Sequence, residues 1–235
     1  MVRSRVEPSQ HGALTATPAG GGWCGHADPP DSELGGLVGE IRRCRICVER
    51  PLGKPLPHQP RPVVRAAAAA PIVVCGQAPG TRVHASGQPF TDPSGVRLRD
   101  WMGIDETVFY DTTKVAVVPM GFCFPGLDAK GGDLPPRREC APAWHDSVFA
   151  AMPNLRLILA VGLYAHRYHL PAWRKCSLTE RVAAFREIMA AGDRPVVVPL
   201  PHPSWRNNAW IRRNPWFGEE LLPVLRRQIA DVLAV

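Results

Sequence analysis

Three glycine- and proline-rich loops carry side chains of the types that bind ligands or catalyse reactions. They are residues 76–80 (GQAPG), 119–123 (PMGFC) and 201–204 (PHPS), and each directly follows a short apolar run. Taken singly, each loop has an ordinary explanation, because glycine and proline shape tight turns and a histidine is common in loops. If the apolar runs are parallel strands, however, the loops meet at the carboxyl edge of one sheet, where ligands bind. We therefore expect one site assembled from distant parts of the chain.

The cysteines form two pairs. Cys44 and Cys47 are separated by two residues, and Cys123 and Cys140 by sixteen. Four thiolates can hold an iron–sulfur cluster or a zinc ion, and the spacing alone favours neither. The other cysteines are not assigned to this site: Cys75 lies inside an apolar run and is interpreted as a small buried side chain, and Cys24 and Cys176 have no partner pattern.

Four short apolar runs of strand length alternate with helical patterns. The runs cover residues 72–75, 115–118, 155–161 and 196–200. The helical patterns lie at about 95–103, 136–152, 163–170, 178–191 and 216–233. Strands that alternate with helices imply βαβ units and a buried parallel sheet. The predicted fold class is α/β, a three-layer α/β/α arrangement around a central, mostly parallel four-stranded sheet.

The chain before the first strand is less regular. Residues 1–30 are rich in Gly, Pro, Ser and Ala, which predicts a disordered tail. Asp31 and Ser32 can cap a short helix that ends near Arg43. Residues 44–70 are rich in Pro and Arg and are expected to form an irregular excursion. We expect residues 31–235 to form a single domain.

The composition favours a polyanionic partner. The formal net charge is +7 and the isoelectric point is about 9.3, while 45% of the residues are hydrophobic, enough for one sizeable core. The segment 202–217 contains no acidic residue, and its tryptophans at 205, 210 and 216 alternate with basic side chains. Its candidate nucleic-acid contacts are Ser204, Arg206, Arg212 and Arg213. The alternative is a solvated helix whose tryptophans pack on the core.

The sequence also suggests where the protein works. No apolar run is long enough to cross a bilayer, and residues 1–22 lack the apolar centre of a signal peptide. We expect a cytoplasmic, nucleoid-associated monomer with reduced thiols.

The order of these motifs resembles a known family. GQAPG is followed by Ser86-Gly87-Gln88-Pro89-Phe90, then by a DPSG turn and a helix, and near the end by HPSWRNN. This order is similar to that of the uracil-DNA glycosylase superfamily, and to its iron–sulfur branch (the fourth and fifth families) in particular. The resemblance runs from about Cys44 to Trp210. It implies that Cys44, Cys47, Cys123 and Cys140 hold a 4Fe–4S cluster, with zinc as the alternative.

The resemblance also implies roles for individual residues. Such enzymes flip the target base out of DNA into a pocket. Phe90 matches the aromatic residue on which the base stacks, although it could instead be a core residue. His202 matches the histidine that stabilises the departing uracil anion. The implied uracil-binding set is Gly76, Gln77, Phe90, Met120, Gly121, His202 and Asn208.

The sequence departs from the family at two positions. The acid of the first motif is replaced by Gln77, which can position a water molecule but cannot take its proton. The nearest candidate carboxylate is Asp92, which could equally cap the following helix. The asparagine that reads uracil, four residues before the third cysteine, is replaced by Pro119. Backbone groups near Met120 and Gly121, or the side chains of Asn207 or Asn208, would then read the base.

These observations predict a DNA-repair enzyme of base excision repair. It would hydrolyse the N-glycosidic bond of uracil, with room for other deaminated bases, in single- or double-stranded DNA, with His202, Gln77 and Asp92 as catalytic residues. It would be monofunctional, because Lys54, Lys114, Lys130 and Lys175 all lie outside the three loops and no amine nucleophile is available there. The alternative is a non-catalytic module of the same fold that binds nucleic acid or DNA damage. A nucleotide-binding α/β enzyme is disfavoured, because the sequence contains neither a P-loop nor a G-x-G-x-x-G motif.

Overall fold

A parallel sheet of four short strands forms the centre of the computed structural model, which describes residues 32–192 and 194–234. The strands are β1 (Ile72–Cys75), β2 (Val115–Val117), β3 (Leu157–Val161) and β4 (Val196–Leu200), in the order β2-β1-β3-β4. Ile72 pairs with both Val115 and Leu157, and Leu157 pairs with Val196, so the strands start nearly level. The predicted four-stranded sheet is confirmed, and every pairing in it is parallel.

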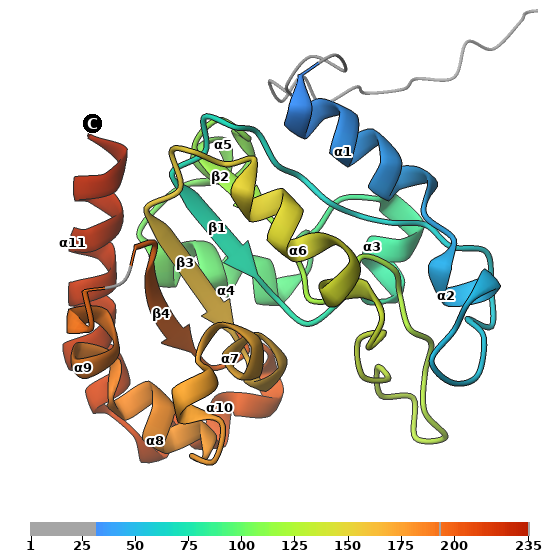
Figure 1. Cartoon of the computed structure of the whole chain (residues 1–235). Helices are drawn as coiled ribbons and strands as arrows, with labels where there is room; N and C mark the ends of the chain where they lie inside the picture. The colour runs from blue at the N-terminus through green and yellow to red at the C-terminus, as the bar shows by residue number, and fades with distance from the viewer. Residues whose placement is uncertain (1–31, 193, 235) are drawn as a thin grey trace, which may run out of the picture.

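Helices cover both faces of the sheet, which makes the structure three-layered as predicted (Figure 1). Strand residues alternate between two cores: Ile72 and Val74 belong to one, and Val73 and Cys75 to the other. The first core also contains side chains from α4 (Pro93–Met102), α5 (Glu106–Tyr110) and α11 (Leu222–Leu233). The second contains side chains from α1 (Glu33–Arg43), α6 (Cys140–Ala150) and α7 (Leu163–His169). Cys75 is fully buried in this second core, as expected of a small apolar side chain.

The helix boundaries differ from the sequence patterns at three places. The pattern at 178–191 is two helices, α8 (Leu178–Ala183) and α9 (Phe185–Ala190), which meet at Ala184, where ψ is 14°. The pattern at 216–233 opens with a π turn over Phe217–Leu221 before α11 begins. The pattern at 136–152 becomes helical only at Cys140, because Pro135 and Pro136 favour extended backbone before it.

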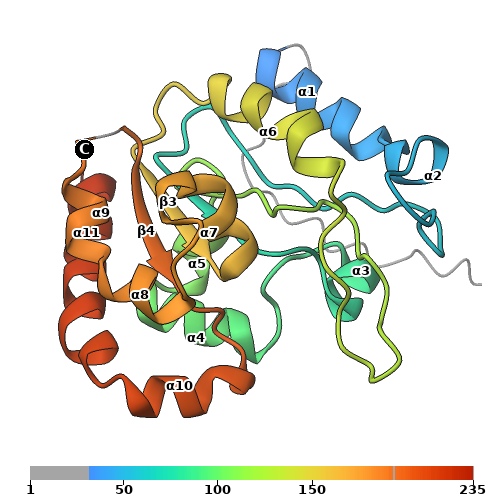
Figure 2. The same ribbon diagram turned by 60° about the horizontal axis from the view of Figure 1, so that its bottom comes forward.

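Several short helices were not predicted, because each is too short to show a periodic apolar face. They are α2 (Ile46–Glu49), α3 (Thr81–Ser86), α5 and α10 (Asn208–Arg213), together with single 3-10 turns at Pro171–Trp173 and Trp205–Asn207. Figure 2 shows α10 and α8 grouped together at the end of the molecule toward which the arrow of β4 points.

No helix in the described part of the chain has the length and apolarity needed to cross a membrane.

The excursion that precedes β1 is attached to the sheet at defined points. The N–H of Val63 donates to the carbonyl of Phe122 over 2.7 Å. Arg65 and Val117 exchange two backbone hydrogen bonds, of 2.7 and 3.1 Å, in an isolated antiparallel bridge. The segment therefore covers the free edge of β2, which would otherwise expose unpaired backbone groups.

Candidate active site

A cavity of about 300 Å³ opens at the carboxyl edge of the sheet. Five of the residues predicted for the site line it: Gly76, Gln77, Phe90, Asp92 and His202. They come from the loop after β1, from the segment before α4 and from the loop after β4, so distant parts of the chain meet at this edge as expected. Pro119, from the loop after β2, completes this part of the wall.

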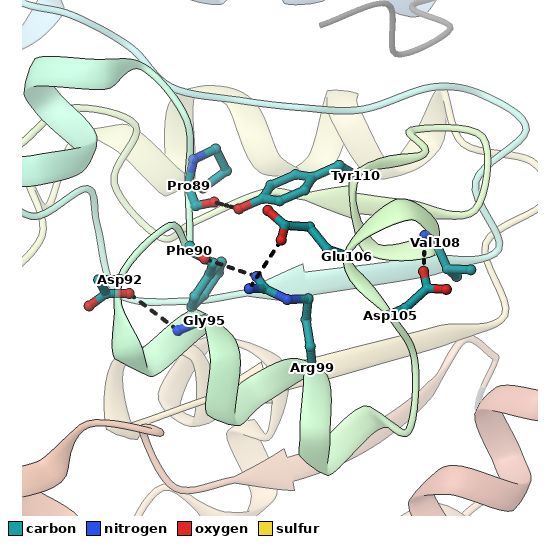
Figure 3. Close-up of polar contacts among 9 residues, drawn as sticks. All are labelled: Pro89, Phe90, Asp92, Gly95, Arg99, Asp105, Glu106, Val108 and Tyr110. Carbon is teal, nitrogen blue, oxygen red and sulfur yellow. Dashed lines mark hydrogen bonds and ion pairs between the residues drawn. The ribbon is translucent and has the colours of Figure 1, made fainter.

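The backbone of Phe90 is held in an unusual conformation. Its φ is +58°, in the left-handed region that non-glycine residues rarely adopt. Arg99 Nη1 donates to the Phe90 carbonyl over 3.1 Å, and the Tyr110 hydroxyl donates to the Pro89 carbonyl over 2.8 Å (Figure 3). A Cβ on Gly95 would lie 1.7 Å from the Phe90 carbonyl oxygen, so glycine is required at that position. Such strain is maintained where the surroundings fix a functional geometry.

The Phe90 ring is both a core contact and a cavity wall. Its edge-to-face contact with Phe109 has a centroid distance of 5.8 Å, and it packs on the core that α4 covers. The ring tip also lies against Gly76, where an added Cβ would be 3.5 Å from Phe90 Cζ. The two interpretations of Phe90 left open by the sequence are therefore compatible.

Asp92 also combines its two predicted roles. It is the N-cap of α4, and its Oδ1 accepts a 3.2 Å hydrogen bond from the N–H of Gly95 (Figure 3). The same residue lines the cavity. One carboxylate oxygen is thus engaged in holding the start of the helix.

His202 is prepared as a neutral hydrogen-bond donor. The N–H of Ser204 donates to His202 Nδ1 over 3.2 Å, so the neutral ring carries its proton on Nε2. Burial lowers the pKa of His202 below its usual value, and Asp92 offsets this only in part. Asn207 Nδ2 donates to the His202 carbonyl over 2.7 Å. Gly162, at the end of β3, approaches His202 so closely that an added Cβ would lie 3.7 Å from His202 Cβ.

Gln77 is attached to a loop that sequence reasoning did not include. Its Nε2 donates to the carbonyl of Leu134 over 3.1 Å, across 57 positions of the sequence. The residue before Leu134 is Asp133, and Asp133 lines the cavity. Arg82, in the first turn of α3, lines it too. Arg82 could have been found from its position next to GQAPG, whereas Asp133 lies in an aperiodic segment with no such signal.

Three residues predicted to bind uracil are engaged elsewhere. The N–H groups of Met120 and Gly121 donate to the carbonyls of Gly76 and Gln77 over 2.9 and 3.0 Å. Asn208 Oδ1 accepts a 2.8 Å hydrogen bond from Arg97, which also donates to the Ser204 carbonyl. None of the three is among the described residues that line the cavity. In this structure they join the motif loops to each other and to α4.

Pro119 occupies the position where the resembling family has its base-reading asparagine. It lines the cavity, but its carbonyl is bonded to His145 Nε2 over 3.0 Å. Pro119 therefore forms part of the cavity wall without offering a hydrogen bond to the base.

The four predicted ligand cysteines lie in one region. Cys47 and Cys123 share a side-chain hydrogen bond, which lowers the pKa of Cys47 to about 7. Cys140 Sγ accepts a 3.3 Å hydrogen bond from the N–H of Phe122 and interacts electrostatically with Cys44 and Cys47. This donor set suits a thiophilic metal or cluster. Within residues 32–192 and 194–234, however, no three Cys, His, Asp or Glu side chains are already arranged around one metal position.

A basic segment follows the loop that carries His202. Arg206, Arg212 and Arg213 are exposed, and the Arg206 guanidinium lies 5.9 Å from the centroid of the Trp205 ring. The tryptophans of this segment differ: Trp205 is 74% exposed, whereas Trp210 and Trp216 pack on the core. The DNA-facing interpretation and the core-packing alternative each describe part of the segment.

The comparison with known families agrees with this architecture. A family model described as the Uracil DNA glycosylase superfamily matches residues 64–226, which include all four strands and every residue that lines the cavity except Val63. The match includes GQAPG, the SGQPF segment and the PHPS loop. On this evidence the chain belongs to the uracil DNA glycosylase superfamily.

Proposed function

We propose that this protein is a monofunctional uracil-DNA glycosylase that leaves an intact abasic site. Membership of the superfamily supports DNA as its partner. The observation that carries the finer proposal is the pairing of a neutral His202, with its proton on Nε2, and the Phe90 ring in one cavity. Other deaminated bases remain within its chemical reach, because Pro119 provides no side-chain hydrogen bond to discriminate among them.

The chemistry follows from the charge that develops during cleavage. As the bond between the sugar C1′ and the base N1 breaks, its electron pair moves onto uracil and the sugar becomes oxocarbenium-like. A donor aimed at the uracil O2 stabilises that negative charge. His202 Nε2–H is such a donor, and because the ring is already neutral the anion forms next to an uncharged imidazole.

Binding must first bring the base into the cavity. A flipped pyrimidine would stack on Phe90, whose position is fixed by Arg99 and Gly95. The exposed Trp205 is suited to occupy the gap left in the base stack, and Arg206, Arg212, Arg213 and Ser204 would contact the phosphates.

The position of the lysines outside the cavity supports a monofunctional enzyme. All four lysines are described, and none lines the cavity. A Schiff base with the sugar would require an amine there. The product should therefore be an abasic site without a strand break until alkali is added, and borohydride should trap no covalent protein–DNA adduct.

We also propose that Cys44, Cys47, Cys123 and Cys140 hold a 4Fe–4S cluster. The pairwise interactions among the four thiols and the N–H that points at Cys140 Sγ support it. When bound, such a cluster would cross-link the excursion to α6. Purified protein should contain roughly four irons per chain and absorb broadly in the visible range, and Cys140→Ala should lower its stability. A colourless protein with one stoichiometric zinc would instead support the zinc alternative.

The deciding experiment is a single-turnover excision assay on uracil-containing oligonucleotides, both single- and double-stranded. We expect alkali-labile sites at uracil only, and matched oligonucleotides with thymine serve as the control. Tight binding to uracil-containing DNA with no excision would favour the non-catalytic module. That alternative is supported by the engagement of Gln77, which replaces the motif acid, with Leu134.

A further inference from the structure

The loop that carries Asp133 is a compact, internally bonded turn. The N–H of Leu134 donates to the Gly126 carbonyl over 2.9 Å, and that of Asp128 to the Gly132 carbonyl over 2.8 Å. Asp128 Oδ1 accepts from the N–H groups of Lys130 and Gly132 over 2.8 and 2.9 Å. The loop therefore has a defined shape and can hold a side chain in a fixed place.

Two contacts fix this loop against the cavity. The Gln77 amide donates to the Leu134 carbonyl over 3.1 Å. A Cβ on Gly80 would lie 3.4 Å from Asp133 Oδ2, so the carboxylate lies against the loop that follows β1. Asp133 thereby reaches a cavity formed mainly by other parts of the chain.

The other described titratable or amide groups that line the cavity are less suited than Asp133 to accept a proton from water, since each is engaged at least in part elsewhere. His202 uses Nδ1 to accept from Ser204 and presents Nε2–H as a donor. Asp92 uses Oδ1 to cap α4, and Gln77 has an amide in place of a carboxylate. Asp133 is the remaining carboxylate among these residues.

We propose that Asp133 is the catalytic residue that takes a proton from the attacking water during base excision, and that Gln77 positions its loop. This inference rests on the proposed function. The C1′–N1 bond breaks and its electron pair leaves with uracil, next to His202 Nε2–H. The water oxygen then forms a bond to C1′, and one of its protons passes to the Asp133 carboxylate. The products are an abasic sugar, a uracil anion and a protonated Asp133, so charge and atoms balance.

The electrostatic surroundings of Asp133 suit this role. Desolvation raises the pKa of its carboxyl above the usual value, and the negative charge of Asp92 adds to this effect. Arg206 acts in the opposite direction and keeps the ionised form accessible. A more basic carboxylate is a better general base at neutral pH.

The test compares Asp133→Asn with Asp128→Asn in single-turnover excision over a range of pH. Asp128 is the matched control, because it has the same charge in the same loop, is not among the residues lining the cavity, and keeps its Oδ1 acceptor for the Lys130 and Gly132 N–H groups when it is replaced by Asn. We expect Asp133→Asn to lose activity by about 10²- to 10⁴-fold and to lose the acid limb of the pH profile. Asp128→Asn should keep both the wild-type rate and the wild-type profile.

Chemical rescue separates a catalytic loss from a structural one. In Asp133→Ala, added sodium formate should restore part of the rate, while affinity for uracil-containing DNA stays unchanged. A wild-type rate and pH profile in Asp133→Asn, or a loss in Asp133→Ala that formate does not relieve, would overturn the role of Asp133 and leave the proposed function intact. A wild-type protein that excises no uracil would overturn both.

Discussion

Two groups of histidines in this protein are held neutral by burial, yet the structure uses them differently. His202 lies at the carboxyl edge of the sheet, with Nδ1 bonded to the backbone and Nε2 available to the cavity. His145 and His166 are fully buried beside the second core, and each uses Nε2 on backbone carbonyls: Pro119 for the first, Ala160 and Leu200 for the second. The difference lies in which ring nitrogen the backbone binds. Where the backbone binds Nδ1, as in His202, the Nε2–H remains available to a ligand. Where the backbone binds Nε2, as in His145 and His166, the ring stabilises the fold.

Among the residues of this comparison, His202→Ala should have the largest effect on excision. Loss of a donor to a developing oxyanion typically costs about 3–4 kcal/mol, or a hundred- to a thousandfold in rate. We expect that loss in single-turnover excision, with stability little changed because His202 is only partly buried. His202→Ala should also impair excision more than Asp92→Asn does, and the reverse order would show that the Asp92 carboxylate dominates.

The buried pair should instead reduce stability in acid, together with His169, whose pKa burial lowers to about 3. Burial lowers the pKa values of His145 and His166 to about 4, from an unfolded value near 6.5. Above pH 6.5 both states are neutral, so these groups add no pH dependence. As the pH falls from 6.5 to about 4 the unfolded state binds protons and the native state does not, so each histidine reduces the free energy of unfolding by up to about 3 kcal/mol.

Denaturant unfolding at several pH values measures this effect. His145→Gln keeps an amide donor for the Pro119 carbonyl but does not titrate, so it should flatten the curve between pH 6.5 and 4. The substitution of His202 should change the curve in the same direction, because burial also lowers the pKa of that ring. A His145→Gln curve as steep as that of the wild type would remove His145 from the explanation.

Phe90→Ala should reduce excision, but by less than His202→Ala does. Loss of base stacking is expected to cost about 1–3 kcal/mol in excision. Phe109→Leu, which alters the core behind Phe90 without removing the cavity wall, is the control. If excision by Phe90→Ala is unchanged, the ring is a core residue only and the base binds elsewhere.

Replacing arginines in the basic segment 202–217 is expected to give the smallest loss of function for each residue changed. Replacing Arg206, Arg212 and Arg213 together should weaken DNA binding and reduce the slope of log affinity against log salt by about one for each phosphate that the variant no longer binds. The control is a triple replacement of the exposed arginines Arg42, Arg43 and Arg50, which removes the same charge from another part of the surface. Equal effects of the two triple replacements would mean that net charge, and not this surface, binds DNA.

The fold could be predicted largely from local patterns. Apolar runs of strand length between helical segments indicated all four strands to within two residues, because burial on both faces of a parallel sheet leaves a continuous apolar signature. The short helices α3 and α10 could not be found this way, because they cover less than two turns. The cavity residues Phe90 and His202 were identified because the segments that carry them resemble motifs of a known family.

The sequence by itself determined the strands, the family motifs and the cysteine pairs, because each is encoded by neighbouring residues. Only the tertiary structure decided that Asp133 lines the cavity, since a hydrogen bond between positions 57 residues apart holds its loop there. It likewise decided that Asn208 bonds to Arg97 and that the N–H groups of Met120 and Gly121 are already paired. Each backbone or side-chain donor can make only one or a few hydrogen bonds. Which acceptor it reaches depends on how segments distant in the sequence pack together.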